Sequence, residues 1–306
     1  MGEKMVLVTG CTASGKGGVA FELARRWGGE ILYVDSMKVY RGMDVGTAKP
    51  SGAKRAVVRH HLVDVVEPYE SFSVGRYVEM ADEVIDELRK RKSPIILVGG
   101  TAMYIRALLE GLFEGPPADA VLRDRLKKEA EEVGFGSLYK KLQEVDPVGA
   151  ERIHPNDLKR VIRGLEVYEL TGKALSSFQT HFRSGNYRYD CKIFCLRREK
   201  EDSHRRINQR VKKMMEKGLV EEVQGLLAAP KGLSPQAAQA VGYAEIIDHL
   251  EGGISLNEAV EKIKINTRRL AKRQRTWFRS FEKVNWVEMG AEDSAEEAAG
   301  KVLGNF

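Results

Sequence analysis

The sequence predicts an α/β protein in which helices flank a parallel sheet and a helical insertion interrupts the chain. Two observations predict this class. Short apolar runs alternate with longer amphipathic stretches, a pattern typical of parallel sheets with helical connections. From residue 120 to about residue 179 the apolar spacing is helical, and no convincing strand interrupts it. The 306 residues are enough for one large domain or two of ordinary size.

The first expected strand, residues 5–9, leads into a glycine-rich turn, and a helix is expected over 16–27. The turn reads Gly10-Cys11-Thr12-Ala13-Ser14-Gly15-Lys16. Backbone N–H groups in such a turn point at one spot, and Lys16 adds a positive charge there, so the turn is suited to bind phosphate. A merely solvated lysine is the plainer interpretation, and the strand before and the helix after disfavour it.

Two further strands should bring polar side chains to the same edge of the sheet. A strand over 30–35 ends on Asp35, and a strand over 94–98 ends just before Thr101. Because carboxyl ends of strands converge on the ligand crevice of an open α/β sheet, both side chains should lie near the phosphate. An ATPase would often place a carboxylate after the later strand, and Gly99-Gly100-Thr101 disfavours that activity. Helices are expected over 74–91 and 101–110.

The segment Glu114-Gly115-Pro116-Pro117-Ala118-Asp119 ends this pattern, because proline does not continue a helix interior. Strands are expected again over 191–196 and 284–288. The helices expected in the second half cover 201–217, 219–228, 236–250 and 255–281. The small, acidic tail over 291–306 is expected to form at most a loosely attached helix. The predicted domains are a P-loop NTPase-like core (1–117 and 189–306) and a helical insertion domain (118–188).

The composition is that of a soluble globular protein, with 42% apolar and 31% charged residues. A net charge of +6 permits a polyanionic partner without demanding one. We expect no membrane span and no secretory signal, because no apolar run is long enough and a strand begins almost at once. Cys11, Cys191 and Cys195 are too few and scattered for a disulfide framework, which favours the cytoplasm. Core packing, not zinc binding, is expected for Cys191 and Cys195.

Motifs spread over nearly the whole chain resemble the signatures of tRNA dimethylallyltransferases, in the expected order. Besides the glycine-rich turn they cover 35–50, 60–64, 99–108, 154–157, 160, 163, 166–168, 218–223, 242–243, 271–274 and 276–279. The resemblance is far more specific than a lone glycine loop. It implies transfer of a dimethylallyl group from dimethylallyl pyrophosphate to N6 of adenosine 37, in the anticodon stem-loop of tRNA, with Mg²⁺ as cofactor. We expect a monomer.

The resemblance also implies roles for individual residues. The donor pyrophosphate would be held by Gly10, Cys11, Thr12, Ala13, Ser14, Gly15, Lys16 and Gly17. Asp35, Thr101, Lys16 and Arg210 would act in catalysis. The tRNA would be contacted by Asp35, Ser36, Met37, Lys38, Thr101, Arg123, Lys159, Arg160, Val161, Ile162 and Arg163.

Chemistry gives reasons for these roles, and each has a plainer alternative. A carboxylate at Asp35 can orient the N6 amine and take its proton, whereas a helix cap is the plain alternative. Thr101 can stabilise charge on the leaving group or cap the next helix. Arg206 and Arg210 share a helix face that suits pairing with pyrophosphate oxygens, although surface charge is a rival for Arg206. Lys159, Arg160 and Arg163 could form a solvated helix face.

Three positions depart from the family's pattern. Gly17 stands where a Ser or Thr hydroxyl would hold Mg²⁺, so the metal ligand is unknown: Thr12, Ser14, water or the pyrophosphate itself could serve. Lys38 replaces the usual Gln and supplies only donors, so any contact that accepts from the base is lost; phosphate contact, or a shifted preference for neighbouring nucleotides, is the alternative. Ala244 replaces a lysine. Gly17 and Gly18 should also weaken the first helical turn, by about 1 kcal/mol each.

A strongly basic strip lies near the C-terminus. Residues 262–283 hold nine Lys or Arg against one Glu, with Trp277, Phe278 and Phe281 between them. Such a strip is an electrostatic footprint for a phosphate backbone, whereas the aromatic residues are better suited to packing this helix on the sheet.

Three other functions remain open at this level. A nucleotide kinase would share the phosphate loop but should carry Ser or Thr at position 17. An isopentenyltransferase acting on free adenine nucleotides would share the donor site, although the insertion and basic strip favour a large RNA. A non-catalytic P-loop RNA-binding protein is the alternative from a different class.

Overall fold

The computed structural model describes residues 4–112, 115–178 and 187–304, and it divides into two compact units. The first unit joins Met1–Leu109 to Tyr187–Phe306, and the second is Glu110–Asn186. The division falls where helix α4 ends, at Glu110, rather than at the proline pair to which the sequence pointed. Glu114, the first residue of the expected break, and residues 179–186 of the predicted insertion domain (118–188) lie outside the described residues.

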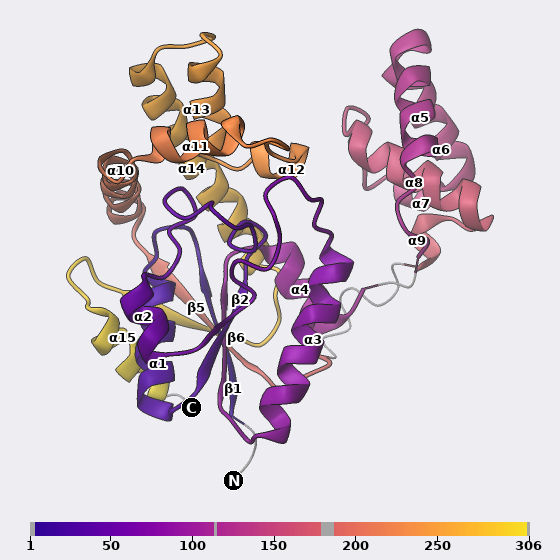
Figure 1. Cartoon of the computed structure of the whole chain (residues 1–306). Coiled ribbons are helices and arrows are strands. Elements are labelled where there is room, and N and C mark those ends of the chain that lie inside the picture. The colour runs from indigo at the N-terminus through magenta and orange to yellow at the C-terminus, as the bar shows by residue number, and fades with distance from the viewer. Residues whose placement is uncertain (1–3, 113–114, 179–186, 305–306) are drawn as a thin grey trace. The chain divides into compact units, whose positions relative to one another are not determined.

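The first unit is built on one six-stranded parallel sheet (Figure 1). Its strands are β1 (Met5–Gly10), β2 (Glu30–Val34), β3 (His60–His61), β4 (Ile95–Gly99), β5 (Lys192–Arg198) and β6 (Val284–Met289). The order is β3-β2-β4-β1-β5-β6, so β1 is central and pairs with β4 and β5. The expected α/β class is therefore confirmed. The sequence missed β3, which has only two residues and so shows no periodicity.

The helices of the first unit agree closely with the expected ranges. They are α1 (Lys16–Trp27), α2 (Gly52–Val57), α3 (Val74–Lys90), α4 (Ala102–Glu110), α10 (Lys200–Glu216), α11 (Leu219–Ala228), α12 (Pro235–Ala238), α13 (Tyr243–Leu250), α14 (Leu256–Phe278) and α15 (Ala295–Leu303). The helix expected over 236–250 is two helices, because Gly242 adopts φ 101° between them. The missed helix α2 buries no residue and so carries no apolar stripe. Within the described residues, no helix is both long and apolar enough to cross a bilayer.

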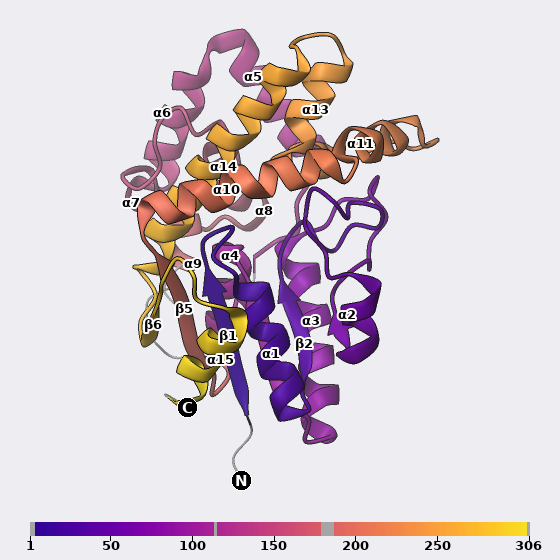
Figure 2. The same ribbon diagram turned by 90° about the vertical axis from the view of Figure 1, so that its left-hand side faces the viewer.

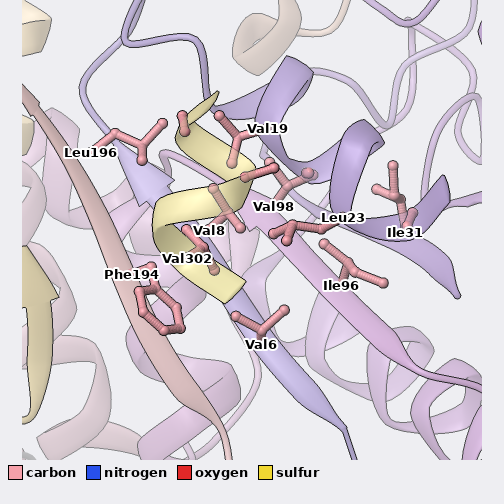
Figure 3. Close-up of a cluster of buried hydrophobic side chains, with 14 of the residues drawn as sticks. Val6, Val8, Val19, Leu23, Ile31, Ile96, Val98, Phe194, Leu196 and Val302 are labelled. Atoms are coloured by element: carbon pink, nitrogen blue, oxygen red, sulfur yellow. The ribbon is translucent and has the colours of Figure 1, made fainter. Parts of the chain in front are cut away.

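Helices α1 and α15 lie on one face of the sheet, and α3 and α4 lie on the other (Figures 1 and 2). On the α1 face, alternate strand residues such as Val6, Val8 and Phe194 pack with Val302 of α15 (Figure 3). The side chain of Val302 is 0% exposed. The expectation of a loosely attached tail was therefore wrong, because the small residues of α15 let it pack closely and complete the core.

Four helices from the second half of the chain, α10, α11, α13 and α14, gather beyond the carboxyl ends of the strands (Figure 2). Because Asp35 and the glycine-rich turn follow β2 and β1 directly, they face these helices. The sheet and these helices together enclose the site.

The second unit is a small helical domain. Its helices are α5 (Ala120–Val133), α6 (Phe135–Val145), α7 (Pro147–Ala150), α8 (Leu158–Thr171) and α9 (Leu175–Phe178). Leu126, Leu138, Leu142 and Leu165 are central to its own apolar core. No strand occurs in the described part of this unit, as the helical periodicity predicted.

Candidate active site

A cavity of about 1360 Å³ opens at the carboxyl edge of the sheet. Its lining cations are Lys16, Lys38, Lys49, Arg55, Arg206, Arg210, Lys213, Lys217 and Arg273. The carboxylates that line it are Asp35, Asp44 and Asp64. Because cations outnumber carboxylates by nine to three, the cavity suits an anionic ligand.

The glycine-rich turn offers backbone N–H groups that have no partner in the described part of the chain. Ser14 N–H donates to the carbonyl of Cys11 (3.1 Å), and Thr12 N–H donates to a side chain. The amides of Ala13, Gly15, Lys16 and Gly17 donate to no described residue. They stand at the N-terminus of α1, where the helix dipole also favours an anion. The turn is therefore an open cradle for phosphate.

Gln274 on α14 holds this turn in place, although no individual role was assigned to it from the sequence. Gln274 Oε1 accepts from Thr12 N–H (2.8 Å), and its Nε2 donates to the carbonyl of Gly100 (2.7 Å). A Cβ at Gly100 would lie 2.6 Å from Gln274 Nε2, so a side chain at this position would displace the Gln274 amide. The motif that contains Gln274 was visible in the sequence, but only the fold shows that it joins the ends of β1 and β4.

Two arginines support the turn from the other side. Arg198 Nε donates to the carbonyl of Ser14 (2.9 Å), and Arg206 Nε donates to the carbonyl of Ala13 (2.9 Å). Ala13 has φ 62°, an unusual conformation for a residue with a side chain. Because the carbonyls of Ala13 and Ser14 point toward the two arginines, the N–H groups of the turn face the cavity. Arg206 is thus part of the site rather than surface charge, and Arg198 was missed because its contact spans 184 residues.

Lys16 lies in the cavity beside this cradle. Its Nζ donates to the carbonyl of Cys11 (3.1 Å). Burial lowers the pKa of Lys16 to about 8; nearby Asp35 raises it, and Arg210 lowers it further. A bound anion would restore the charged form.

This pKa predicts a pH dependence for pyrophosphate binding. Free Lys16 is charged below about pH 8 and neutral above it, so affinity should fall by up to about tenfold per pH unit above that value. Burial is the main cause that lowers the pKa of Lys38 to about 7. A fall in affinity above about pH 8 is therefore assigned to Lys16 and not to Lys38. Calorimetric titration with inorganic pyrophosphate should show this fall.

Lys16→Arg provides the control, because arginine stays charged throughout and should flatten the profile. Parallel pH profiles for the two proteins would contradict this role of Lys16, because titration of the pyrophosphate itself affects both equally.

Asp35 begins a tight turn directly after β2. Its Oδ1 accepts from the N–H groups of Met37 (2.9 Å) and Lys38 (3.2 Å). No described residue donates to Oδ2, and the side chain lines the cavity. One oxygen therefore fixes the carboxylate, and the other is available to a ligand. The sequence allowed Asp35 to be only a helix cap. In the structure, the hydrogen bonds of this turn orient the carboxylate.

Thr101 and Ser36 join the ends of β4 and β2. Thr101 Oγ1 accepts from Ser36 N–H (3.2 Å) and lies 3.4 Å from Ser36 Oγ. The hydroxyl therefore contacts the neighbouring strand end, and Thr101 contributes its carbonyl to α4 by accepting from Ile105 N–H (3.0 Å). Thr101, Ser36 and Met37 line the same cavity as Asp35 and Lys16, as the sequence predicted for converging strand ends.

Arg210, on α10, lines the cavity and lacks an acceptor. No described residue accepts a hydrogen bond from it or pairs with it within 4.0 Å. Burial lowers its pKa, and Asp35 opposes that effect. A half-buried guanidinium without a partner is costly, so the site is prepared for an anion brought by the ligand.

The amino group of Lys38 contacts a loop of the protein itself. Its Nζ donates to the carbonyls of Thr47 (2.8 Å) and Ala48 (2.5 Å) and lies 5.3 Å from the centre of the Tyr33 ring. Lys38 also lines the cavity.

In the second unit the expected tRNA contacts fall into three groups. Val161 is 1% exposed and Ile162 is 5% exposed, so these side chains form core and cannot contact RNA. Arg123 and Arg163 both pair with the fully buried Glu166. Lys159 and Arg160 are exposed.

The Arg123–Glu166–Arg163 cluster still carries a net positive charge, but its guanidinium groups are fixed by the fold. Arg123 Nε and Nη2 each lie 2.8 Å from the Glu166 carboxylate. Pairing with both arginines lowers the pKa of Glu166 although burial opposes this. Sequence spacing could show that Arg163 neighbours Arg160 and Glu166 on one helix, but it could not show that Arg123, 43 residues before Glu166, pairs with the same carboxylate.

Two of the three aromatic residues of the basic strip pack inward, as expected, whereas the half-buried Trp277 lines the cavity. Phe278 is 1% exposed and Phe281 is 8% exposed, and their ring centres lie 6.2 Å apart. Arg273 of the same strip lines the cavity, and Lys272 and Arg279 are exposed. The strip therefore offers positive charge to the outside and anchors itself through its aromatic side.

The cysteines are free thiols, and two of them are core residues as predicted. Burial raises the pKa of both Cys191 and Cys195 to about 12. Nowhere in the described ranges do three or more His, Cys, Asp or Glu side chains gather as a metal site would require.

Comparison with known proteins gives consistent results. A family model described as IPP transferase matches residues 38–281. The tRNA dimethylallyltransferase of Geobacter metallireducens is 48% identical over 285 residues, which are 93% of this chain and 92% of the relative. That of Geobacter sulfurreducens is 47% identical over 304 residues, covering 98% of this chain and 97% of the relative.

Two solved structures are similar over almost the whole chain. The full-length tRNA isopentenylpyrophosphate transferase from Bacillus halodurans has a TM-score of 0.72 at 38% identity, covering 99% of this chain and 96% of its own. A eukaryotic dimethylallyltransferase, described as acting on tRNA, has a TM-score of 0.82 at 26% identity, covering 99% of this chain and 80% of its own.

Proposed function

The chain belongs to the tRNA dimethylallyltransferase family and is a transferase that prenylates tRNA, and on this premise we propose its substrates and the roles of its residues. The donor is dimethylallyl pyrophosphate, and the acceptor is N6 of adenosine 37 in the anticodon stem-loop. The other functions that the sequence left open are not favoured by these relatives.

One observation carries the proposal: the phosphate cradle and the oriented carboxylate of Asp35 share one cavity. A nucleotide kinase would use the cradle, but it would need no carboxylate aimed at an amine. Lys16 and Arg210 line the same cavity as Asp35, whose charge raises the pKa of both.

The proposed reaction is a single displacement at the allylic carbon. The target base is flipped into the cavity, as with other enzymes that modify a base. The free oxygen of Asp35 accepts from the N6 amine and takes its proton as the N6–carbon bond forms and the carbon–oxygen bond to pyrophosphate breaks. Lys16, the free loop amides, Thr101 and Arg210 stabilise the negative charge on the departing pyrophosphate.

We propose Mg²⁺ as the cofactor, although the residues present do not form a protein-held site for it. Gly17 has no hydroxyl, and the buried Ser14 Oγ has no hydrogen-bond partner among the described residues but does not line the cavity. Of the candidate protein ligands only Thr12 lines the cavity, and a single hydroxyl does not make a metal site. Mg²⁺ prefers oxygen ligands and retains several waters. The metal would therefore arrive with the pyrophosphate, whose oxygens and water supply its ligands.

Gly17→Thr is expected to keep or raise activity and to lower the Mg²⁺ concentration needed for half-maximal rate. The substitution fits, because a Cβ at Gly17 would meet nothing within 4 Å. A hydroxyl at this position could bind the metal directly. The measurement is the initial rate as a function of Mg²⁺ concentration.

Gly17→Val is the matched control, since valine has the shape of threonine without the hydroxyl. Equal Mg²⁺ dependence in the wild type and both variants would count against the proposal.

We further propose that the exposed Lys159 and Arg160, together with the basic strip, contact the tRNA backbone. The three free thiols and a tRNA substrate favour a cytoplasmic location for the protein. A monomer is proposed because a single chain supplies every group named in the reaction.

Incubation with labelled dimethylallyl pyrophosphate and Mg²⁺ tests the proposed function. Parallel reactions contain tRNA, tRNA with adenosine 37 replaced by guanosine, or AMP. Label is expected only with unsubstituted tRNA. Label in AMP would indicate free nucleotides as acceptors, and label in none would indicate a non-catalytic RNA-binding protein.

A further inference from the structure

A carboxylate from α11 occupies an anion-binding turn on the acceptor side of the cavity. Glu222 Oε2 accepts from the N–H groups of Asp44 (2.9 Å) and Val45 (2.7 Å). Its Oε1 accepts from Gly46 N–H (3.2 Å). Three consecutive amides that converge on one carboxylate form a concave anion site in the backbone, and hydrogen bonds to a charged acceptor are the strong ones.

Tyr243 of α13 completes this arrangement. Its hydroxyl donates to Glu222 Oε1 (2.5 Å), and burial followed by the Glu222 charge raises the pKa of the tyrosine. The ring packs so closely on Gly46 that a Cβ there would lie 2.4 Å from it. The loop is thus built to receive Glu222 and Tyr243 together.

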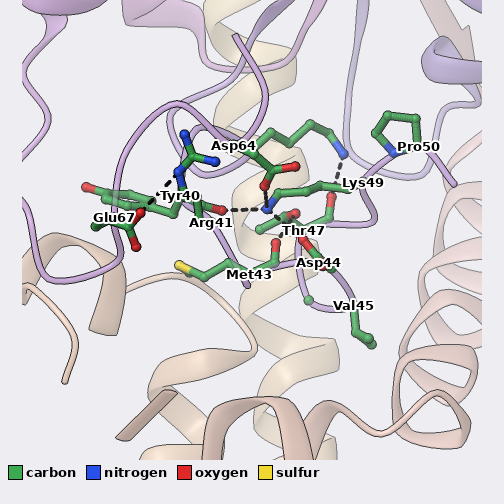
Figure 4. A network of polar contacts seen from close by, with 12 residues as sticks. Tyr40, Arg41, Met43, Asp44, Val45, Thr47, Lys49, Pro50, Asp64 and Glu67 are labelled. Carbon is green, nitrogen blue, oxygen red and sulfur yellow. Dashed lines mark hydrogen bonds and ion pairs between the residues drawn. The ribbon is translucent and has the colours of Figure 1, made fainter. Parts of the chain in front are cut away.

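The same loop supports the turn that contains Asp35. Thr47 and Ala48 provide the two carbonyls that accept from Lys38 Nζ, and Lys38 N–H donates to Asp35 Oδ1. Lys49 anchors the far end of the loop (Figure 4): its Nζ lies 2.7 Å from Asp44 Oδ1 and 2.5 Å from Asp64 Oδ1. A continuous series of contacts therefore links α11 to the carboxylate that engages the acceptor.

The donor side of the cavity has its own supports. Gln274, Arg198 and Arg206 hold the glycine-rich turn, and among the described residues none of the three bonds to 44–46. Loss of the Glu222 contact should therefore affect one side of the site and spare the other.

We propose that Glu222 is a positioning residue for the acceptor adenine: it fixes the loop over 44–48 and, through Lys38, the orientation of Asp35. The proposal rests on the proposed function, since its kinetic effect is measured with tRNA. It assigns to the α11–α13 helices a role in acceptor alignment that is separate from pyrophosphate binding.

Glu222→Gln tests the proposal. Glutamine keeps the shape but replaces one acceptor oxygen by an NH₂ group, which must face a backbone N–H donor or the tyrosine hydroxyl. Glu221→Gln is the matched control: it makes the same chemical change one position earlier, on the exposed face of α11. Tyr243→Phe removes one donor while keeping the ring, and it serves if Glu222→Gln does not fold.

Three measurements are made on each protein: amide hydrogen exchange of 44–46, kcat/KM for tRNA, and the Kd for inorganic pyrophosphate. Glu222→Gln is expected to speed exchange and to lower kcat/KM for tRNA by about tenfold, with pyrophosphate affinity unchanged. Tyr243→Phe should change the first two in the same direction by a smaller factor, about threefold. Glu221→Gln should match the wild type.

Equal losses of tRNA efficiency and pyrophosphate affinity in Glu222→Gln would overturn the proposal, because they would show general destabilisation. Unchanged exchange and kinetics in Glu222→Gln or Tyr243→Phe would overturn it as well. A wild-type protein that labels no tRNA would defeat the proposed function, and the exchange measurement would then decide alone whether Glu222 holds the loop.

Discussion

Asp35→Asn is expected to lower kcat by a factor of about 100 or more while leaving pyrophosphate binding unchanged. Asparagine still presents an oxygen to the N–H groups of Met37 and Lys38, so the turn should persist. The change removes the basic oxygen that faces the cavity. An aromatic amine is a poor nucleophile, and its proton must leave as the new bond forms. The loss should therefore fall on the chemical step, which single-turnover labelling of tRNA measures.

The pyrophosphate Kd of the same variant is the internal control, because the glycine-rich turn has its own supports. Asp35→Ala is a useful companion, since it should also weaken the turn and lower stability by about 1 kcal/mol. A kcat for Asp35→Asn within a few-fold of the wild type would show that Asp35 merely caps the turn.

Arg210→Gln is expected to weaken pyrophosphate binding by a factor of about 30 to 100, the effect of removing a charge-assisted pair from a half-buried site. Because Arg210 has no acceptor among the described residues, its removal should leave the unliganded protein as stable as before, or slightly more stable. Calorimetry with inorganic pyrophosphate and a thermal melt measure the two effects.

Arg205→Gln is the matched control, because Arg205 is an exposed arginine on the same helix that pairs with Asp202 and does not line the cavity. It should leave affinity unchanged. Equal affinity losses in both variants would mean that the general charge of α10, and not a specific contact, attracts the anion.

The sheet and the centre of the site could be predicted from the sequence because they depend on local patterns. Apolar runs in the sequence predicted β1, β2 and β4. Because the carboxyl ends of parallel strands converge, Asp35, Thr101 and Lys16 were predicted to lie together, and all three line one cavity. The glycine pattern predicted the phosphate-binding turn from the sequence alone. Each of these inferences needs only the order of nearby residues.

The supports of the site could not be predicted, because they are contacts across long stretches of chain. Gln274 bonds to a loop 262 residues earlier, and Glu222 bonds to a loop 178 residues earlier. Amphipathic spacing also cannot tell an RNA-facing side chain from a buried one at the edge of an apolar face. Val161 and Ile162 were assigned to tRNA only through the resemblance to the family, and their side chains instead pack in the core of the second unit.

Residue type alone also could not predict how α15 packs or what Lys38 contacts. Small residues such as Ala298 and Ala299 have little hydrophobic signal, yet both are buried in the core, because they let one face of α15 pack closely. A lysine in place of glutamine suggested altered base recognition, whereas its Nζ reaches two carbonyls of a neighbouring loop. Neither outcome follows from residue type alone.

The most direct test is a crystal structure of the protein with pyrophosphate and an anticodon stem-loop that contains adenosine 37. We expect the pyrophosphate on the free amides of the glycine-rich turn, within reach of Lys16 and Arg210. The N6 amine should lie about 3 Å from the free oxygen of Asp35. A flipped adenine bound elsewhere, or a pyrophosphate that avoids the turn, would contradict the account.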